Sequence, residues 1–104
     1  MARFDVYAHP DTELRKVTPF LLDVQNSYID SLATRVVLPL RLASEFHAAM
    51  RGLNPAFEVR GKKVVLDTAA IGAFPASGIG KPIADLTAQS IDIVSALDTL
   101  FGSY

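Results

Sequence analysis

The sequence predicts a mainly β protein with a C-terminal α-helix, and three observations support this fold class. Short apolar segments with the two-residue period of strands occupy most of the chain up to residue 79. Turn-forming Pro, Gly, Asn and Asp residues separate these segments. The last segment, residues 87–101, instead repeats apolar residues at helical spacing. Strands followed by a helix favour a mostly antiparallel sheet with the helix packed on one side.

Three strands are predicted in the N-terminal part of the chain, at residues 3–7, 20–25 and 34–40. The first alternates apolar and polar residues, and the other two are rich in apolar residues. Pro39 has no amide proton, so it predicts a strand end or a sheet edge at that point. Residues 26–33 form a loop between the second and third strands, and this loop carries large apolar residues.

The middle of the chain predicts a short helix and a hairpin. Apolar residues within 42–51 are spaced as in about two helical turns, and Gly52 is placed to end that helix in a left-handed conformation. Residues 57–60 and 63–66 read as two strands joined by a tight connection, Gly61-Lys62. Residues 69–79 read as an extended segment bent by glycine and proline.

The C-terminal helix is the most strongly patterned element, with Thr87 as its expected N-cap and Asp85 near its positive end. Its predicted buried stripe contains Ile93, Ala96, Leu97 and Leu100, widened by Ile91, Val94 and Phe101. Phe101 is therefore expected to be at least partly buried. The residues after it, Gly102, Ser103 and Tyr104, are expected to be exposed.

Composition restricts the class of protein further. With 104 residues, 50% hydrophobic and 20% charged, residues 1–104 are expected to form a single folded domain. The charges of ten basic and eleven acidic residues nearly cancel, which argues against sequence-independent electrostatic binding to nucleic acid. The absence of cysteine excludes disulfides and thiolate chemistry. No signal peptide or membrane-spanning run is visible, so a soluble cytoplasmic protein is expected.

The residues that usually carry catalysis do not form a recognisable pattern. Asp23 lies in an apolar strand and Asp30 in a loop, without a third group to complete an acid–base site. His9 and His47 are expected in exposed settings. Gly78-Ile79-Gly80-Lys81 lacks the spacing of a phosphate-binding loop. No catalytic residue, metal site or cofactor is predicted, and a binding module is the interpretation that remains.

A resemblance to a known family makes this interpretation more specific. Residues 20–30 read FLLDVQNSYID and residues 35–40 read RVVLPL. This block closely resembles the CcdB toxins of ccd toxin–antitoxin modules, in which DVQ and a short loop are followed by Arg, apolar residues and Pro-Leu. The similarity continues through Phe4-x-Val6-Tyr7, Leu53-x-Pro55, Ala84-Asp85-Leu86 and Asp92-Ile93-x-x-Ala96, so it spans nearly the whole chain.

The resemblance implies a small cytoplasmic homodimer with an SH3-like barrel of antiparallel strands and a C-terminal helix, the fold of the MazF and Kid toxins. It implies a toxin that is not an enzyme. Such toxins bind the dimerisation domain of the DNA gyrase A subunit and trap the gyrase–DNA cleavage complex, in a role that includes plasmid maintenance. A CcdA-type antitoxin neutralises them through a disordered segment that folds on binding. Toxin and antitoxin together repress their operon, and the antitoxin supplies the DNA contact, which agrees with the near-neutral charge.

The same resemblance assigns two sets of binding residues. The gyrase-binding set is Tyr28, Ile29, Asp98, Gly102, Ser103 and Tyr104. The antitoxin-binding set is Asn26, Tyr28, Ile29, Asp30, Ile91, Ser95 and Asp98. An exposed Tyr28-Ile29 pair suits the role of an interface anchor, because a few aromatic and aliphatic groups carry most binding energy. The alternative is that the two residues only cap the end of the barrel.

The C-terminus departs from the family pattern. The family's poisons typically end Phe-Trp-Gly-Ile, whereas this chain ends Phe101-Gly102-Ser103-Tyr104 and contains no tryptophan. Loss of an indole that stacks on the partner costs about 2–4 kcal/mol if nothing replaces it. One alternative function is therefore a homologue that has lost gyrase poisoning and keeps antitoxin binding and regulation. Another is a MazF-like ribonuclease, for which Arg35, Arg60 and His9 are the available residues.

Homodimerisation is also expected from the apolar pattern itself. The run at residues 36–40 and the segment at residues 69–79 present more apolar sheet surface than one terminal helix covers. Exposed apolar patches of that size usually mark an interface.

Overall fold

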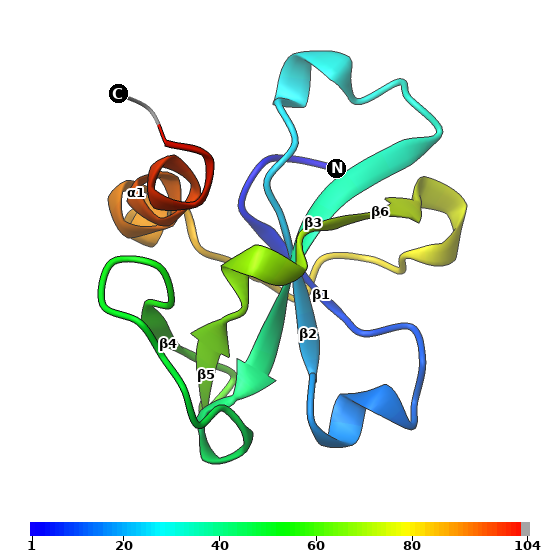
Figure 1. Ribbon diagram of the computed structural model, residues 1–104. Coiled ribbons are helices and arrows are strands. Elements are labelled where there is room, and N and C mark those ends of the chain that lie inside the picture. Colours follow the sequence, from blue (N-terminus) through cyan, green and yellow to red (C-terminus); the bar gives the residue numbers. More distant parts are fainter. Residues whose placement is uncertain (103–104) are drawn as a thin grey trace.

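The computed structural model describes residues 1–102, which form a seven-stranded antiparallel sheet curled into a nearly closed barrel with one C-terminal helix (Figure 1). The strands are β1 (Asp5–Ala8), β2 (Phe20–Asp23), β3 (Thr34–Leu42), β4 (Ala56–Val59), β5 (Lys62–Leu66), β6 (Gly72–Pro75) and β7 (Ala84–Asp85). Their order in the sheet is β4-β5-β3-β2-β1-β7, and β6 pairs with β3. The predicted mainly β fold with a C-terminal helix is confirmed.

The long strand β3 connects the two parts of the sheet. It pairs with β2 on one side and, on the other, first with β6 as far as Val37 and then with β5 from Leu40. Pro39 lies where the partner changes, and its carbonyl accepts a hydrogen bond from the amide of Asp67 at 2.9 Å. Because Pro39 has no N–H, it cannot return a hydrogen bond to Asp67, and it lies where the pairing with β5 ends. The expected strand end or sheet edge at Pro39 is wrong, because β3 continues to Leu42 and has partner strands on both sides.

The predicted hairpin is confirmed as β4 and β5, although its connection lies one residue earlier than expected. Val59 pairs with Lys62, so the two connecting residues are Arg60 and Gly61. Both have positive φ angles, 52° and 77°. A two-residue turn with positive φ at both positions matches the twist of the flanking strands.

The helix predicted at residues 42–51 is wrong. Leu42 belongs to β3: it pairs with Val64, and its amide donates to the carbonyl of Val17 at 2.8 Å. Only a single 3-10 turn, Ala43–Glu45, follows. Sheet pairing outweighs the weak helical spacing of the next residues. Gly52 does adopt the expected left-handed conformation, with φ of 82°, but within a turn.

The segment predicted as extended at residues 69–79 is more broken than expected. The short strand β6 lies between two 3-10 turns, Thr68–Ala70 and Ala76–Gly78. The two-residue strand β7 has no counterpart among the predicted strands. It pairs with β1 just before the helix and so ties the start of the helical segment to the sheet.

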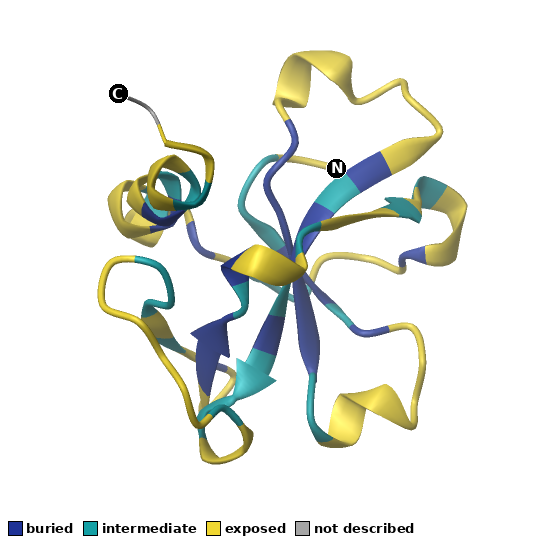
Figure 2. Ribbon diagram, viewed as in Figure 1, coloured by how far each residue is buried: buried dark blue, intermediate teal, exposed yellow. Residues whose placement is uncertain are grey.

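The central strands are largely buried (Figure 2). Their side chains fall into two buried clusters, one on each face of the sheet. The larger lies inside the barrel and includes Val6, Leu22, Leu38, Leu40, Val59, Val64, Leu66, Ile93 and Ala96. The smaller, on the opposite face, contains Tyr7, Leu21, Val37 and Ile79, with Phe74 packed against it. Neighbours in sequence, such as Val37 and Leu38, therefore point into different clusters.

This double burial accounts for part of the apolar pattern from which a dimer is expected. Val37, Leu38 and Leu40 are all buried within one chain. Of the segment at residues 69–79, Phe74 and Ile79 pack against the Val37 face of the sheet, whereas Ala69, Ala70 and Ala73 are exposed.

The helix α1 (Ser90–Phe101) follows a 3-10 turn at Thr87–Gln89 and lies beside the β4–β5 hairpin (Figure 1). Thr87 is not its N-cap. The carboxylate of Asp85 accepts hydrogen bonds from both the amide and the hydroxyl of Thr87, at 2.7 and 2.5 Å. These bonds hold the pKa of Asp85 below its usual value. The Asp85 carboxylate therefore holds the start of the 3-10 turn that precedes α1.

The buried stripe of α1 is narrower than predicted. Ile93 and Ala96 are buried, whereas Ile91 is 83% exposed and Phe101 69% exposed. At roughly 100° per residue, Phe101 lies about 90° from the centre of the stripe and Ile91 about 170°. The expected burial of Phe101 is wrong, and so is the place of Ile91 on the core face. Both side chains are available at the surface.

Candidate functional site

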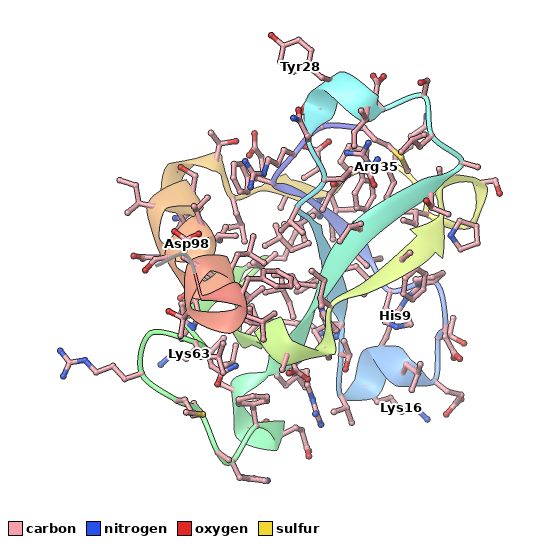
Figure 3. The ribbon with its side chains drawn as sticks, turned by 45° about the horizontal axis from the view of Figure 1, so that its top comes forward. His9, Lys16, Tyr28, Arg35, Lys63 and Asp98 are labelled. Atoms are coloured by element: carbon pink, nitrogen blue, oxygen red, sulfur yellow. The ribbon has the colours of Figure 1, made fainter. Side chains whose placement is uncertain are left out.

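The loop between β2 and β3 presents an exposed aromatic side chain. Its first residues form a 3-10 turn, Ser27–Ile29. Asn26 caps this turn: its Oδ1 accepts from the amide of Tyr28 at 3.0 Å, and its carbonyl accepts from the amide of Ile29 at 3.1 Å. The Tyr28 side chain is 95% exposed and points away from the barrel at the top of Figure 3. Tyr28 therefore does not cap the barrel.

The exposed part of the loop is unusually apolar. Ile29 and Leu32 are exposed together with Tyr28, and Asn26 and Asp30 are exposed beside them. Contiguous apolar groups with a polar rim are typical of an interaction surface.

The base of this loop is held by buried polar groups. Asp23 and Arg35 form an ion pair through two hydrogen bonds of 2.8 and 2.9 Å, and both side chains are fully buried. The amide of Gln25 donates to the same carboxylate at 2.9 Å. On the outer side, the amide of Arg3 donates to the hydroxyl of Ser27 at 3.1 Å. The exposed turn thus rests on an ordered support.

The outer face of α1 forms a second surface. Ser90, Ile91, Val94, Ser95 and Asp98 line a hollow of about 420 Å³. These positions share one side of the helix, because they are spaced by about one turn. The structure therefore brings together all three predicted antitoxin-binding residues of the helix, namely Ile91, Ser95 and Asp98. Ile91 gives the hollow an exposed apolar group, and Asp98 gives it a carboxylate.

The two surfaces are distinct. Figure 1 shows the loop and α1 as separate projections on the upper side of the molecule, and in Figure 3 Tyr28 and Asp98 stand apart. The predicted binding residues of the loop cluster on one surface, and those of α1 cluster on the other. A partner that contacts both sets has to span from one projection to the other.

The helix ends at the start of the predicted tail. Gly102 is the C-cap, with φ of 71°, and its amide donates to the carbonyl of Asp98 at 2.8 Å. Gly102 is exposed, as predicted. Ser103 and Tyr104, the last two residues of the predicted gyrase-binding set, lie outside the described residues.

His9 is buried, so the expectation that it is exposed is wrong. Its Nδ1 accepts a hydrogen bond from the amide of Asp11 at 3.0 Å, and its ring packs edge-on against Phe74. Burial lowers the pKa of His9, Asp11 partly opposes this shift, and Arg15 adds to it. The neutral imidazole is part of the packing beside the smaller cluster. His47 is exposed, as predicted.

Comparison with models of known protein families matches residues 3–102 to the family described as CcdB protein. The chain belongs to the CcdB family. This family consists of toxins of toxin–antitoxin modules. The match contains the whole loop and the whole of α1, and it ends at the helix C-cap.

The ribonuclease alternative finds no support in the geometry of this CcdB-family chain. Arg35 is fully buried against Asp23, and His9 lies buried in another part of the molecule (Figure 3). Arg60 lies in the hairpin turn and donates to the carbonyl of Ile83 at 3.1 and 2.9 Å. The structure does not bring these three side chains together. Among residues 1–102, no group of three or more His, Asp or Glu side chains is arranged to hold a metal ion, and no helix has the length and hydropathy of a membrane span.

The supporting residues of the CcdB-family loop were missed as a group. Asp23 and Gln25 share one face of the chain leaving β2, and Arg35 is the second residue of the neighbouring strand β3. An acid and a base on adjacent apolar strands predict a buried pair, because an unpaired charge is costly there. That signal was present in the sequence.

Proposed function

We propose that this CcdB-family protein is a toxin that binds the dimerisation domain of the DNA gyrase A subunit and traps the gyrase–DNA cleavage complex. The observation that carries the proposal is the 95% exposure of Tyr28 on a capped turn with a buried support. An aromatic ring kept in water has no role in folding stability, but it is a strong anchor when a partner covers it. Ile29, beside it, adds apolar area to the same contact.

The helix end supplies a second aromatic group for the same partner. Phe101 is 69% exposed, and Asp98 lies one turn before it on α1. Family poisons carry a tryptophan after this phenylalanine, whereas this chain has Gly102 followed by Ser103 and Tyr104. We propose that exposed Phe101 provides the aromatic contact that the missing tryptophan would otherwise make. The protein then acts by binding and not by catalysis.

A CcdA-type antitoxin is proposed as the neutralising partner. The hollow on α1 offers exposed Ile91 to an apolar side chain, and Ser95 and Asp98 offer hydrogen-bonding groups at its edge. This pattern suits a disordered peptide that folds as it binds. The peptide would continue to the loop, with Asn26 and Asp30 as its polar contacts there. Because Tyr28, Ile29 and Asp98 belong to both sets, antitoxin and gyrase would exclude one another.

Two further parts of the proposal concern assembly. We expect a homodimer, with support from family membership. Light scattering at micromolar concentration tests it, and a monomer would contradict it. Operon repression is proposed to act through the antitoxin, because a net charge of −1 gives this chain little attraction for DNA.

Supercoiling of relaxed plasmid by purified gyrase tests the central proposal. The wild-type protein should inhibit supercoiling, and a synthetic peptide of the cognate antitoxin's C-terminal segment should relieve the inhibition. Full supercoiling at toxin concentrations well above that of gyrase would contradict the proposal.

A second candidate function is a homologue that binds antitoxin without poisoning gyrase. The observation that favours it is Gly102 at the position of the family's tryptophan in a chain without tryptophan. It predicts a tight antitoxin complex together with unaffected gyrase. The supercoiling assay separates the two candidates directly.

A further inference from the structure

The pairing between β2 and β3 stops abruptly next to the loop. The last paired residues are Asp23 and Val37. One further ladder bond remains, from the amide of Val24 to the carbonyl of Val36 at 3.0 Å. The amide of Val36 does not return the bond to Val24 and donates to Oε1 of Gln25 at 2.9 Å. The Val24 carbonyl accepts from Nε of Arg3 at 3.1 Å instead. Where the two strands separate, side chains thus make the hydrogen bonds that backbone groups would otherwise make with each other.

The Gln25 side chain also reaches into the exposed turn. Its Nε2 donates to the carbonyl of Ile29 at 3.0 Å. The residue is buried, and its backbone is held from both ends: its amide donates to Asp23, and its carbonyl faces Nη2 of Arg35 at 3.5 Å. The amide group of one side chain therefore joins β3 to the residue that follows Tyr28.

We propose that Gln25 is a positioning residue for the binding loop: its amide bridges Val36 and Ile29, and so fixes the direction in which Tyr28 and Ile29 face a partner. The functional part of this proposal rests on the proposed gyrase contact. The bridge needs one acceptor for the Val36 N–H and one donor for the Ile29 carbonyl. A side-chain amide has both, whereas an ionised carboxylate has acceptors only. Preorganisation of this kind reduces the entropy lost when a loop is captured.

The isosteric variant Gln25→Glu tests the bridge without removing volume. At about pH 8 its carboxylate still accepts from Val36 but repels the Ile29 carbonyl. Amide hydrogen exchange should then show protection of Tyr28 and Ile29 falling by roughly tenfold, while protection of Val36 is kept. The ratio of variant to wild-type protection at each of these amides reports the change. The charged neighbours Asp23, Arg35 and Arg3 are present in both proteins, so this ratio isolates the substituted group.

Two control variants separate positioning from general destabilisation. Val64→Ala opens a cavity in β5, so it should speed exchange at Val36 and Ile29 alike. Gln89→Glu places the same charge on an exposed residue at the start of α1 and should leave the loop amides unchanged. Equal loss of protection at Val36 and Ile29 in Gln25→Glu, or no loss at Ile29, would overturn the proposal.

The binding arm uses the purified dimerisation domain of gyrase A and calorimetry. Gln25→Glu should bind roughly tenfold more weakly than wild type at about pH 8. If wild type binds and the variant binds with the same affinity at about pH 8, the positioning role is contradicted. Absence of wild-type binding would refute the gyrase proposal alone, because the exchange experiment needs no partner.

Discussion

Asp23 and Arg35 form a two-bond ion pair between neighbouring strands, with both side chains fully buried. The pair lies where β2 and β3 separate and the exposed loop begins. Its geometry is the favourable one for a guanidinium and a carboxylate, because two parallel N–H donors meet two oxygens. The same carboxylate also accepts the amide of Gln25, so the pair links the sheet to the support of the binding loop.

Breaking this pair should be strongly destabilising. Arg35→Met leaves the Asp23 carboxylate buried without its partner, and we expect the free energy of unfolding to fall by about 3–5 kcal/mol in urea denaturation. The matched control is Lys16→Met, which removes the exposed partner of Glu13 and should change stability by less than about 1 kcal/mol. Similar small losses in both variants would contradict the structural role of the buried pair.

Truncation of Phe101 should separate binding from stability. Because its ring is largely exposed, Phe101→Ala should cost less than about 1 kcal/mol of unfolding free energy. Ile93→Ala, on the buried side of the same helix, should cost about 2–5 kcal/mol. We further expect Phe101→Ala to reduce gyrase inhibition. A loss of stability as large as that of Ile93→Ala would show that Phe101 is packed and not free to contact a partner.

Acidification should destabilise the fold through His9. Burial lowers its pKa in the folded chain below the ordinary value of 6.5, so the unfolded chain binds more protons as the pH falls through that value. Unfolding free energy should therefore decrease below about pH 6.5, by up to ~1.4 kcal/mol per pH unit from this residue. His9→Gln can still accept from Asp11, and it should flatten the dependence. The same slope in variant and wild type would contradict this role.

Alkaline conditions should destabilise the fold through Tyr7. Burial raises the pKa of its fully buried side chain to about 12, helped by the negative charges of Asp5 and Asp23 and opposed by Arg35. Between the unfolded value near 10 and the folded value, only the unfolded chain ionises, so stability should decrease as the pH rises through this window. Urea denaturation of Tyr7→Phe should show a shallower decline than wild type. Parallel declines would refute the assignment to Tyr7.

The strand pattern and the hairpin were predictable because they rest on local alternation and on a turn with glycine. The helix expected at residues 42–51 failed because Leu42 pairs with Val64, a contact between residues far apart in sequence. Helical periodicity placed Ile93 and Ala96 correctly on the buried face of α1. Periodicity did not show how narrow that face is, so Phe101 was wrongly predicted to be buried. Local pattern thus predicts elements better than it predicts their long-range contacts.

The candidate site was predictable in its residues but not in its arrangement. Resemblance supplied the loop and helix positions, and the structure groups Ile91, Ser95 and Asp98 around one hollow. It leaves Tyr28 on a separate projection. The bridge made by Gln25 depends on where β2 and β3 part, which no spacing rule gives. The sequence signal for this role was a polar residue, Gln25, between two apolar strands.

The most direct test of the gyrase proposal is the amount of cleaved plasmid trapped by purified gyrase in the presence of the protein. Wild type should accumulate linear DNA after denaturant is added. Tyr28→Ala should trap at least roughly tenfold less while unfolding at the same urea concentration, because its ring contributes to a partner and not to the core. Deletion of residues 102–104 measures how much the C-terminal tail contributes to trapping of cleaved DNA. Equal trapping by wild type and Tyr28→Ala, or no trapping by wild type, would contradict the account.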